Sequence, residues 1–193
     1  TFYGGNDVQY SYSADCDIAD NLYVVGTTAS LNFPIQNQGG TSYFQGYAGF
    51  WGDAFILKFT NLGVLDWATY YGGNKCLCNI GGVIYPYSWV NGTYDGAMSV
   101  AADAFGNIFV AGLTNSTDFP LLNPGGGAYF QSIIADTAAK YGGSGPCAQD
   151  IDAIESFILK FNNAGQRLWA TYYGGVNADI IVSIATDISG NLL

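Results

Sequence analysis

Histidine is missing from the 193 residues, and the five Lys plus Arg are few for a chain of this length. Histidine is the commonest general base and the commonest metal ligand. Its absence therefore excludes a Ser-His-Asp triad, a Cys-His pair and any histidine metal site within these residues. Glutamate and methionine each occur once, so good helix formers are scarce as well.

Positive charge is too sparse for two classes of partner. The net charge is −10 at pH 7, whereas nucleic-acid binding needs a basic stripe and docking on an anionic membrane needs basic residues. No apolar run approaches the roughly 20 residues of a spanning helix, so we expect no membrane insertion. We expect no signal peptide within these residues either. Because Thr1 lies inside a repeated motif, we expect the start of the gene product to lie outside this sequence.

Glycine and aromatic residues are abundant instead, with 27 Gly, 15 Tyr and 12 Phe. This composition is typical of many short strands joined by tight turns. All but one of the 15 acidic residues are aspartate. Aspartate favours turns, and calcium ligation is the alternative interpretation.

Two phrases recur along the chain. Thr1–Gly5 returns as Thr69–Gly73 and as Thr171–Gly175, and Asp53–Phe59 returns as Glu155–Phe161. Such repetition indicates a stacked array of one supersecondary unit. It also disfavours an enzyme, because a catalytic site needs residues that depart from a repeat.

Alignment of the copies gives a unit of about 68 residues. We divide the single array 1–193 into repeat 1 (1–68), repeat 2 (69–170) and a partial repeat 3 (171–193). Repeat 2 contains insertions near 74–92 and 136–152.

Each unit reads as four short strands with hairpin turns after the first and the third. In repeat 2 these strands are Ser99–Ala102, Ile108–Gly112, Ser156–Phe161 and Leu168–Tyr173, with turns at Asp103–Asn107 and Asn162–Gly165. The strands are apolar on both faces, as in a sheet covered on both sides. The sequence therefore predicts an all-β fold of β-propeller type, with four-stranded antiparallel blades in an open or incomplete array.

The ordered motifs resemble a known family. Trp67–Gly73, the Ser99–Thr114 stretch, Asp118–Pro120 and Phe157–Phe161 are similar to the bacterial SBBP (seven-bladed β-propeller) repeat. The resemblance covers residues 1–73, 93–130 and 153–193. It implies a secreted or surface protein without shared catalytic residues, and the phrasing is most similar to proteins of the Bacteroidetes type.

Fewer than three plain units fit in this sequence, whereas closed propellers take four to eight blades. Two explanations stay open: further blades of a longer chain, or copies of the chain that complete one another's blades. An open edge is a template for pairing, and head-to-tail addition gives a ring or a filament.

Antiparallel strands place both insertions at one end of the blades, which is where a binding surface is usually built. The glycosylation candidates Asn91 and Asn115 lie at the same end. Aromatic residues that do not follow the repeat are candidates for a binding surface, or else anchors of a long loop: Tyr85, Tyr87, Trp89 and Tyr94.

Three cysteines fall in the insertions, and loop topology predicts a disulfide from Cys147 to Cys76 or Cys78. Cys16 belongs to the opposite end, so we expect it to be unbonded to these three within a blade.

Two acidic clusters remain. Asp17, within Asp15–Asn21, recurs as Asp103 and Asp187 and indicates a turn rather than a calcium loop. In the second insertion Asp150, Asp152 and Glu155 are calcium candidates or a carboxylate pair for glycoside cleavage. No catalytic residue is assigned, and no cofactor other than calcium is expected.

The leading hypothesis is a non-catalytic extracellular scaffold, adhesin or filament subunit that associates with itself. The alternative is a module that binds a polysaccharide or a protein through its insertion loops. A carbohydrate-active enzyme is the third hypothesis.

Overall fold

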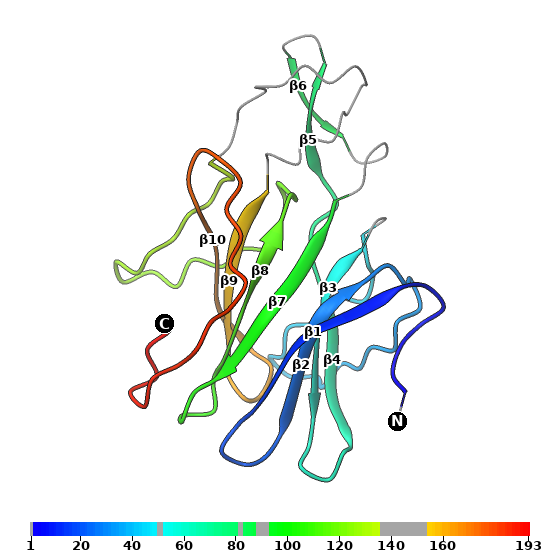
Figure 1. Ribbon diagram of the computed structural model, residues 1–193, viewed down its shortest axis with the longest axis vertical. Coiled ribbons are helices and arrows are strands. Elements are labelled where there is room, and N and C mark those ends of the chain that lie inside the picture. Colours follow the sequence, from blue (N-terminus) through cyan, green and yellow to red (C-terminus); the bar gives the residue numbers. More distant parts are fainter. Residues whose placement is uncertain (1, 50–51, 81–82, 88–92, 136–153) are drawn as a thin grey trace.

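The described residues of the chain form two four-stranded antiparallel sheets and one separate hairpin (Figure 1). This computed structural model describes residues 2–49, 52–80, 83–87, 93–135 and 154–193. The first sheet, here called blade 1, has the order β1-β2-β3-β4, and blade 2 has the order β7-β8-β9-β10. Their strands are β1 (Gln9–Cys16), β2 (Leu22–Thr28), β3 (Asp53–Phe59), β4 (Leu65–Tyr71), β7 (Asp95–Ala102), β8 (Ile108–Thr114), β9 (Glu155–Phe161) and β10 (Arg167–Tyr173). The prediction of an all-β fold with four-stranded propeller-type blades is confirmed.

The two blades repeat each other down to their irregularities. The pairing of β1 with β2 shifts register between Ser11 and Ser13, and the pairing of β7 with β8 shifts between Ala97 and Ser99. Each shift is a β-bulge, which increases the twist of the strand that carries it. The middle strands of both blades are buried almost throughout, which explains why the sequence lacks a polar-apolar alternation there.

Hairpin turns close the end of the blades that is opposite the insertions. Asp17 accepts hydrogen bonds from the N–H groups of Ala19 (2.9 Å) and Asn21 (3.0 Å), as an Asx turn requires. Asp103 and Asp187 make the equivalent bonds in their own turns. The prediction that Asp17 serves a turn is therefore confirmed.

The blades pack face to face through one apolar cluster. Trp67 and Tyr71 of blade 1 meet Phe157 and Phe161 of blade 2 in this cluster, together with Phe119 from the β8–β9 connection. The rings of Trp67 and Phe161 are 5.4 Å apart, and those of Tyr71 and Phe119 are 5.1 Å apart. Burial of these large side chains holds the two sheets together.

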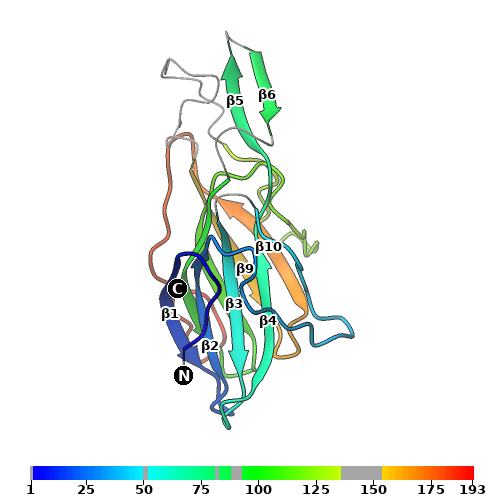
Figure 2. The same cartoon turned by 90° about the vertical axis from the view of Figure 1, so that its right-hand side faces the viewer.

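The first insertion forms a hairpin of its own. Strands β5 (Cys76–Ile80) and β6 (Val83–Tyr87) follow β4 and precede β7 in the sequence, and they pair antiparallel with each other. Figure 2 shows this hairpin extending beyond the ends of both sheets. The second insertion, 136–152, lies outside the described residues.

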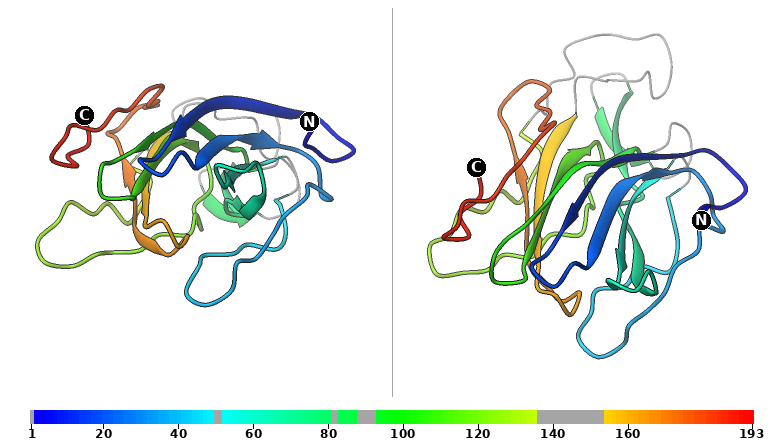
Figure 3. Two further views of the ribbon diagram at one scale, coloured as in Figure 1. Left: turned by 90° about the horizontal axis from the view of Figure 1, so that it is seen from below. Right: turned by 60° about the horizontal axis from the view of Figure 1, so that its bottom comes forward.

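The last 20 residues run alongside blade 2. In the views of Figures 1 and 3, residues 174–193, β7 and β1 follow one another across one side of the molecule. Thr186 and Leu192 form an isolated antiparallel bridge around the turn at Asp187. This segment thus repeats the start of β1–β2 and of β7–β8.

Candidate functional site

A glutamine links three parts of blade 1 near the end that carries the insertions. The Gln45 N–H donates to Thr69 Oγ1 at 2.8 Å, and its Nε2 donates to Asp53 Oδ2 at 2.7 Å. Its Oε1 accepts from the Gly72 N–H at 3.1 Å. The side chain therefore ties the β2–β3 connection to the first residue of β3 and to the end of β4.

Blade 2 contains the same arrangement around Gln131. The Gln131 N–H donates to Thr171 Oγ1 at 2.8 Å, its Nε2 donates to Glu155 Oε2 at 3.2 Å, and its Oε1 accepts from the Gly174 N–H at 3.1 Å. The Ala135 N–H also donates to Glu155 Oε2, at 2.9 Å. Glu155 is thus built into the blade as the counterpart of Asp53.

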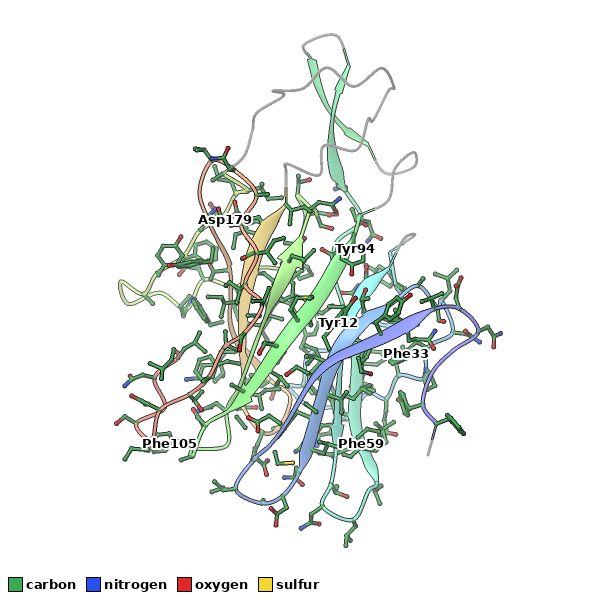
Figure 4. The ribbon with its side chains drawn as sticks, in the orientation of Figure 1. Tyr12, Phe33, Phe59, Tyr94, Phe105 and Asp179 are labelled. Atoms are coloured by element: carbon green, nitrogen blue, oxygen red, sulfur yellow. The ribbon has the colours of Figure 1, made fainter. Side chains whose placement is uncertain are left out.

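The junction between the blades carries a second acid at this end. Asp95, the first residue of β7, accepts hydrogen bonds from the Gly73 N–H (3.0 Å), from Ser116 Oγ (2.8 Å) and from Thr114 Oγ1. Asp179 takes the equivalent place after blade 2, where it accepts from the Gly175 N–H at 2.6 Å. Figure 4 shows Asp179 at the end from which the hairpin projects.

Burial controls the electrostatics of this junction. Burial, and then the charge of Asp95, raise the pKa of Asp53 well above its usual value, against the lowering effect of the Gly49 N–H and Gln45. Burial also raises the pKa of Asp95, to about 7, although its hydrogen bonds act in the opposite direction. The junction therefore contains two carboxyl groups whose ionisation is opposed by their surroundings.

Two cationic side chains join the blades at other points. Arg167 Nη1 of β10 donates to the Tyr71 hydroxyl and to the Pro120 carbonyl, both at 2.9 Å, and its guanidinium lies 4.8 Å from the Tyr43 ring centre. Lys58 Nζ of β3 donates to the Asn163 carbonyl of blade 2 at 2.7 Å.

The innermost strands meet through serine hydroxyls. The Val100 N–H of β7 donates to Ser13 Oγ of β1 at 3.2 Å. The Ile184 N–H donates to Ser99 Oγ of β7 at 3.1 Å. The free edges of β7 and of the last segment are thus covered by side chains of β1 and β7 respectively, as exposed edges require.

The predicted binding residues are only partly described. Tyr85 and Tyr87 fall on β6, whereas Trp89 and Asn91 lie outside the described residues. Tyr94 is half-buried, and burial followed by a hydrogen bond with Tyr12 raises its pKa to about 12. Figure 4 labels both tyrosines, which lie where β1 passes β7. Tyr94 thus helps to join the blades.

Asn115, the other glycosylation candidate, is partly buried. Its Oδ1 accepts from the Tyr94 N–H at 2.7 Å, so the side chain holds the start of β7 against the end of β8.

The disulfide and calcium candidates are described in part as well. Cys76 and Cys78 fall on β5, and Cys147 lies outside the described residues, so the bridge stays a prediction. Cys16 is exposed and free. Asp150 and Asp152 also lie outside, which leaves Glu155 as the one described calcium candidate. Within the described ranges, no group of three or more His, Cys, Asp or Glu side chains could hold a metal ion.

The glutamines were missed by the sequence analysis, although a signal was present. Tyr43–Gln45 and Tyr129–Gln131 share the letters Tyr-Phe-Gln at equivalent positions of the two repeats. Trp67 Nε1 donates to the Tyr43 carbonyl at 2.9 Å, and Trp169 Nε1 donates to the Tyr129 carbonyl at 3.2 Å. The phrase thus recurs because it is anchored in the same way in both blades.

Comparison with known proteins identifies the repeat. Residues 66–120 match the family model of the SBBP beta-propeller repeat. The match begins in β4 of blade 1 and runs through β7 and β8 of blade 2 to Pro120, so it crosses the blade junction. No curated protein matches the chain. In the part of the chain that the structure describes, no helix has the length and apolarity needed to cross a membrane. The resemblance inferred from the motifs is thus confirmed for residues 66–120, which carry an SBBP beta-propeller repeat, whereas the origin in Bacteroidetes stays a prediction.

Proposed function

We propose that this chain is a non-catalytic, extracellular structural module that associates with copies of itself through its blade faces. A bacterial surface location, with a role as scaffold, adhesin or filament subunit, is part of the proposal. The observation that carries it is the repeated contact between inner strands, in which a serine hydroxyl accepts an N–H from the next strand.

On each side of the molecule, a residue equivalent to one partner of this contact is exposed. Ser183 occupies in the last segment the position that Ser13 and Ser99 occupy in β1 and β7, and it is exposed. Ala14 occupies in β1 the position of Val100 in β7, and it is exposed as well. The Ser183 side of one copy is therefore complementary to the Ala14 side of another.

Apolar side chains accompany both surfaces. Tyr10 on β1 is 57% exposed, and Ile180 and Val182 on the last segment are 51% and 69% exposed. Burying this area would add a favourable hydrophobic contribution to the polar contact. Because the two surfaces differ, the interface is head-to-tail, and repeated addition gives a ring or a filament.

A substitution at Ser183 tests the proposal. Sedimentation velocity of the wild-type chain should show species that grow with concentration. Ser183→Glu should shift the chain to monomers, whereas Ser189→Glu, on the exposed turn nearby, should sediment as wild type. A wild-type chain that stays monomeric at all concentrations would overturn self-association and favour further blades of a longer chain as the partner.

A polysaccharide site at the insertion end is the second candidate, because the β5–β6 hairpin stands clear of both sheets (Figure 2). Affinity electrophoresis in gels that contain bacterial surface polysaccharide tests it. Retardation that is lost in a Tyr85→Ala, Tyr87→Ala double variant would support this function, and unchanged mobility of wild type would exclude it for that polysaccharide.

A further inference from the structure

Two buried carboxyl groups approach each other across the blade junction. Asp53 and Asp95 are both completely buried, and they begin β3 of blade 1 and β7 of blade 2. A Cβ atom at residue 72 would lie 2.6 Å from Asp53 Oδ1 and 2.6 Å from Asp95 Oδ2. The two oxygens therefore approach the same point, which only a glycine leaves open.

No cation of the described residues forms an ion pair with these acids. Lys58 pairs with Asp66 at 2.9 Å, and the exposed Lys75 pairs with Asp118 at 3.9 Å. Asp118 adds a further negative charge that raises the pKa of both buried acids. Two buried carboxylates without a compensating charge are strongly disfavoured, so one charge must be removed.

The hydrogen bonds distinguish the two acids. Asp95 accepts from three donors, as an ionised carboxylate does, whereas Asp53 accepts through Oδ2 from Gln45 and is approached by the Gly49 N–H. Asp53 Oδ1 is buried and has no hydrogen-bond partner of normal geometry in the described structure. A protonated oxygen could donate toward Asp95, which would satisfy both groups.

We propose that Asp53 and Asp95 form a proton-binding site at the blade junction, in which Asp53 carries the proton on Oδ1 at neutral pH and Asp95 stays ionised. The proposal is independent of self-association. None of the charged and titratable groups around the two acids supplies a positive charge to them directly, which agrees with the proposed proton. These groups are Tyr43, Tyr70, Tyr94, Tyr172, Asp118 and, through Asp118, Lys75.

The pair recurs at the next junction. A Cβ at residue 174 would overlap Glu155 Oε1 and lie 2.7 Å from Asp179 Oδ2. At the start of the chain Gln9 occupies the position of Asp95, and it accepts from the Gly5 N–H at 3.3 Å. An acid pair beside the first glycine of Gly-Gly is thus a feature of both junctions that follow a complete blade.

The proposed proton makes the stability of the folded protein depend on pH. The native protein holds a proton that an unfolded aspartate, with a pKa of about 3.9, releases as the pH rises. Stability is therefore greatest below that value and is lost as the pH rises through the raised native pKa. For one proton, the unfolding equilibrium constant increases by up to about tenfold per pH unit within this window.

Urea unfolding between pH 5 and pH 8 tests the proposal. Asp53→Asn replaces the proposed O–H by an N–H donor, so this variant should lose the part of the pH dependence that this pair contributes and be more stable than wild type at pH 8. Asp95→Asn replaces one of the two acceptor oxygens by an NH2 group, which cannot accept a hydrogen bond from the three donors. This variant should therefore be less stable than wild type at every pH. Asp20→Asn, which removes an exposed charge in a distant turn, should keep the wild-type profile. Retention of that profile by Asp53→Asn would overturn the proposal.

Infrared spectroscopy of the folded protein gives an independent readout. Wild type at pH 7 should show the C=O band of a protonated buried carboxyl, and Asp53→Asn should lack the part due to Asp53; identical spectra would contradict the assignment. Calcium chloride at pH 8 tests the competing occupant. Stabilisation of wild type but not of Asp53→Asn would make the pair a metal site and overturn proton binding, whereas the absence of this difference supports it.

Discussion

The Ser13 hydroxyl of β1 accepts a hydrogen bond from the Val100 N–H of β7 at 3.2 Å, and Ser99 of β7 repeats the contact with Ile184. The same type of contact thus occurs at two neighbouring junctions. Ser13→Ala would leave the Val100 N–H without its partner, at a cost of about 1 kcal/mol in the free energy of unfolding. Urea denaturation measures this loss. Ser11→Ala, on the same strand and exposed, should lie within about 0.5 kcal/mol of wild type; an equal loss in both would contradict a specific role for Ser13.

Glycine is required at residue 72 by the acids around it. Gly72→Ala would place a Cβ 2.6 Å from two buried carboxyl oxygens, so we expect a loss of about 2–3 kcal/mol. Thermal and urea unfolding measure it. Gly175→Ala is the control, because its Cβ would lie 3.7 Å from Asp179 Oδ2, an ordinary contact. If Gly72→Ala were as stable as Gly175→Ala, the junction would have room for a Cβ atom, which would contradict this explanation.

Burial distinguishes the recurring turn aspartates. Asp103 is 3% exposed and accepts from the N–H groups of Phe105 and Asn107. Asp103→Ala should cost about 2 kcal/mol, because partly buried N–H groups lose their acceptor. Asp187→Ala removes the same bonds at an exposed turn, where water replaces them, and should lose clearly less stability. Equal losses in urea denaturation would mean that burial has no part in the effect.

Arg167 joins the blades through its planar guanidinium group. It donates to the Tyr71 hydroxyl and the Pro120 carbonyl while it lies over the Tyr43 ring. Lysine cannot make this set of contacts, so Arg167→Lys should destabilise the chain by about 1–2 kcal/mol. Lys160→Arg should be tolerated, because Lys160 lies over Phe109 within its own blade. Equal stability of Arg167→Lys and wild type would contradict this role of the guanidinium.

The sequence predicted the strands well where the repeat is uninterrupted. The third strand of repeat 2 was expected at Ser156–Phe161 and is Glu155–Phe161. The first strand was expected at Ser99–Ala102 but begins at Asp95, before the bulge at Ala97/Ser99. A bulge disturbs the period of two on which strand prediction depends, so the part before it was missed.

Sequence patterns could not predict the acid pair. Asp53 and Asp95 begin strands of different blades, and only the packing of one blade on the next brings their carboxyl groups together. Glu155 was interpreted together with Asp150 and Asp152 because these acids are neighbours in sequence. Its contacts with Gln131 and Ala135 join residues that are 24 and 20 positions apart in the sequence.

Negative-stain electron microscopy of the purified chain at high concentration tests the central claim most directly. We expect rods or rings assembled from many copies of the 20.5 kDa chain, each joined to the next through the Ser183 and Ala14 sides. A field of separate particles of single-chain size, unchanged as the concentration is raised, would contradict it.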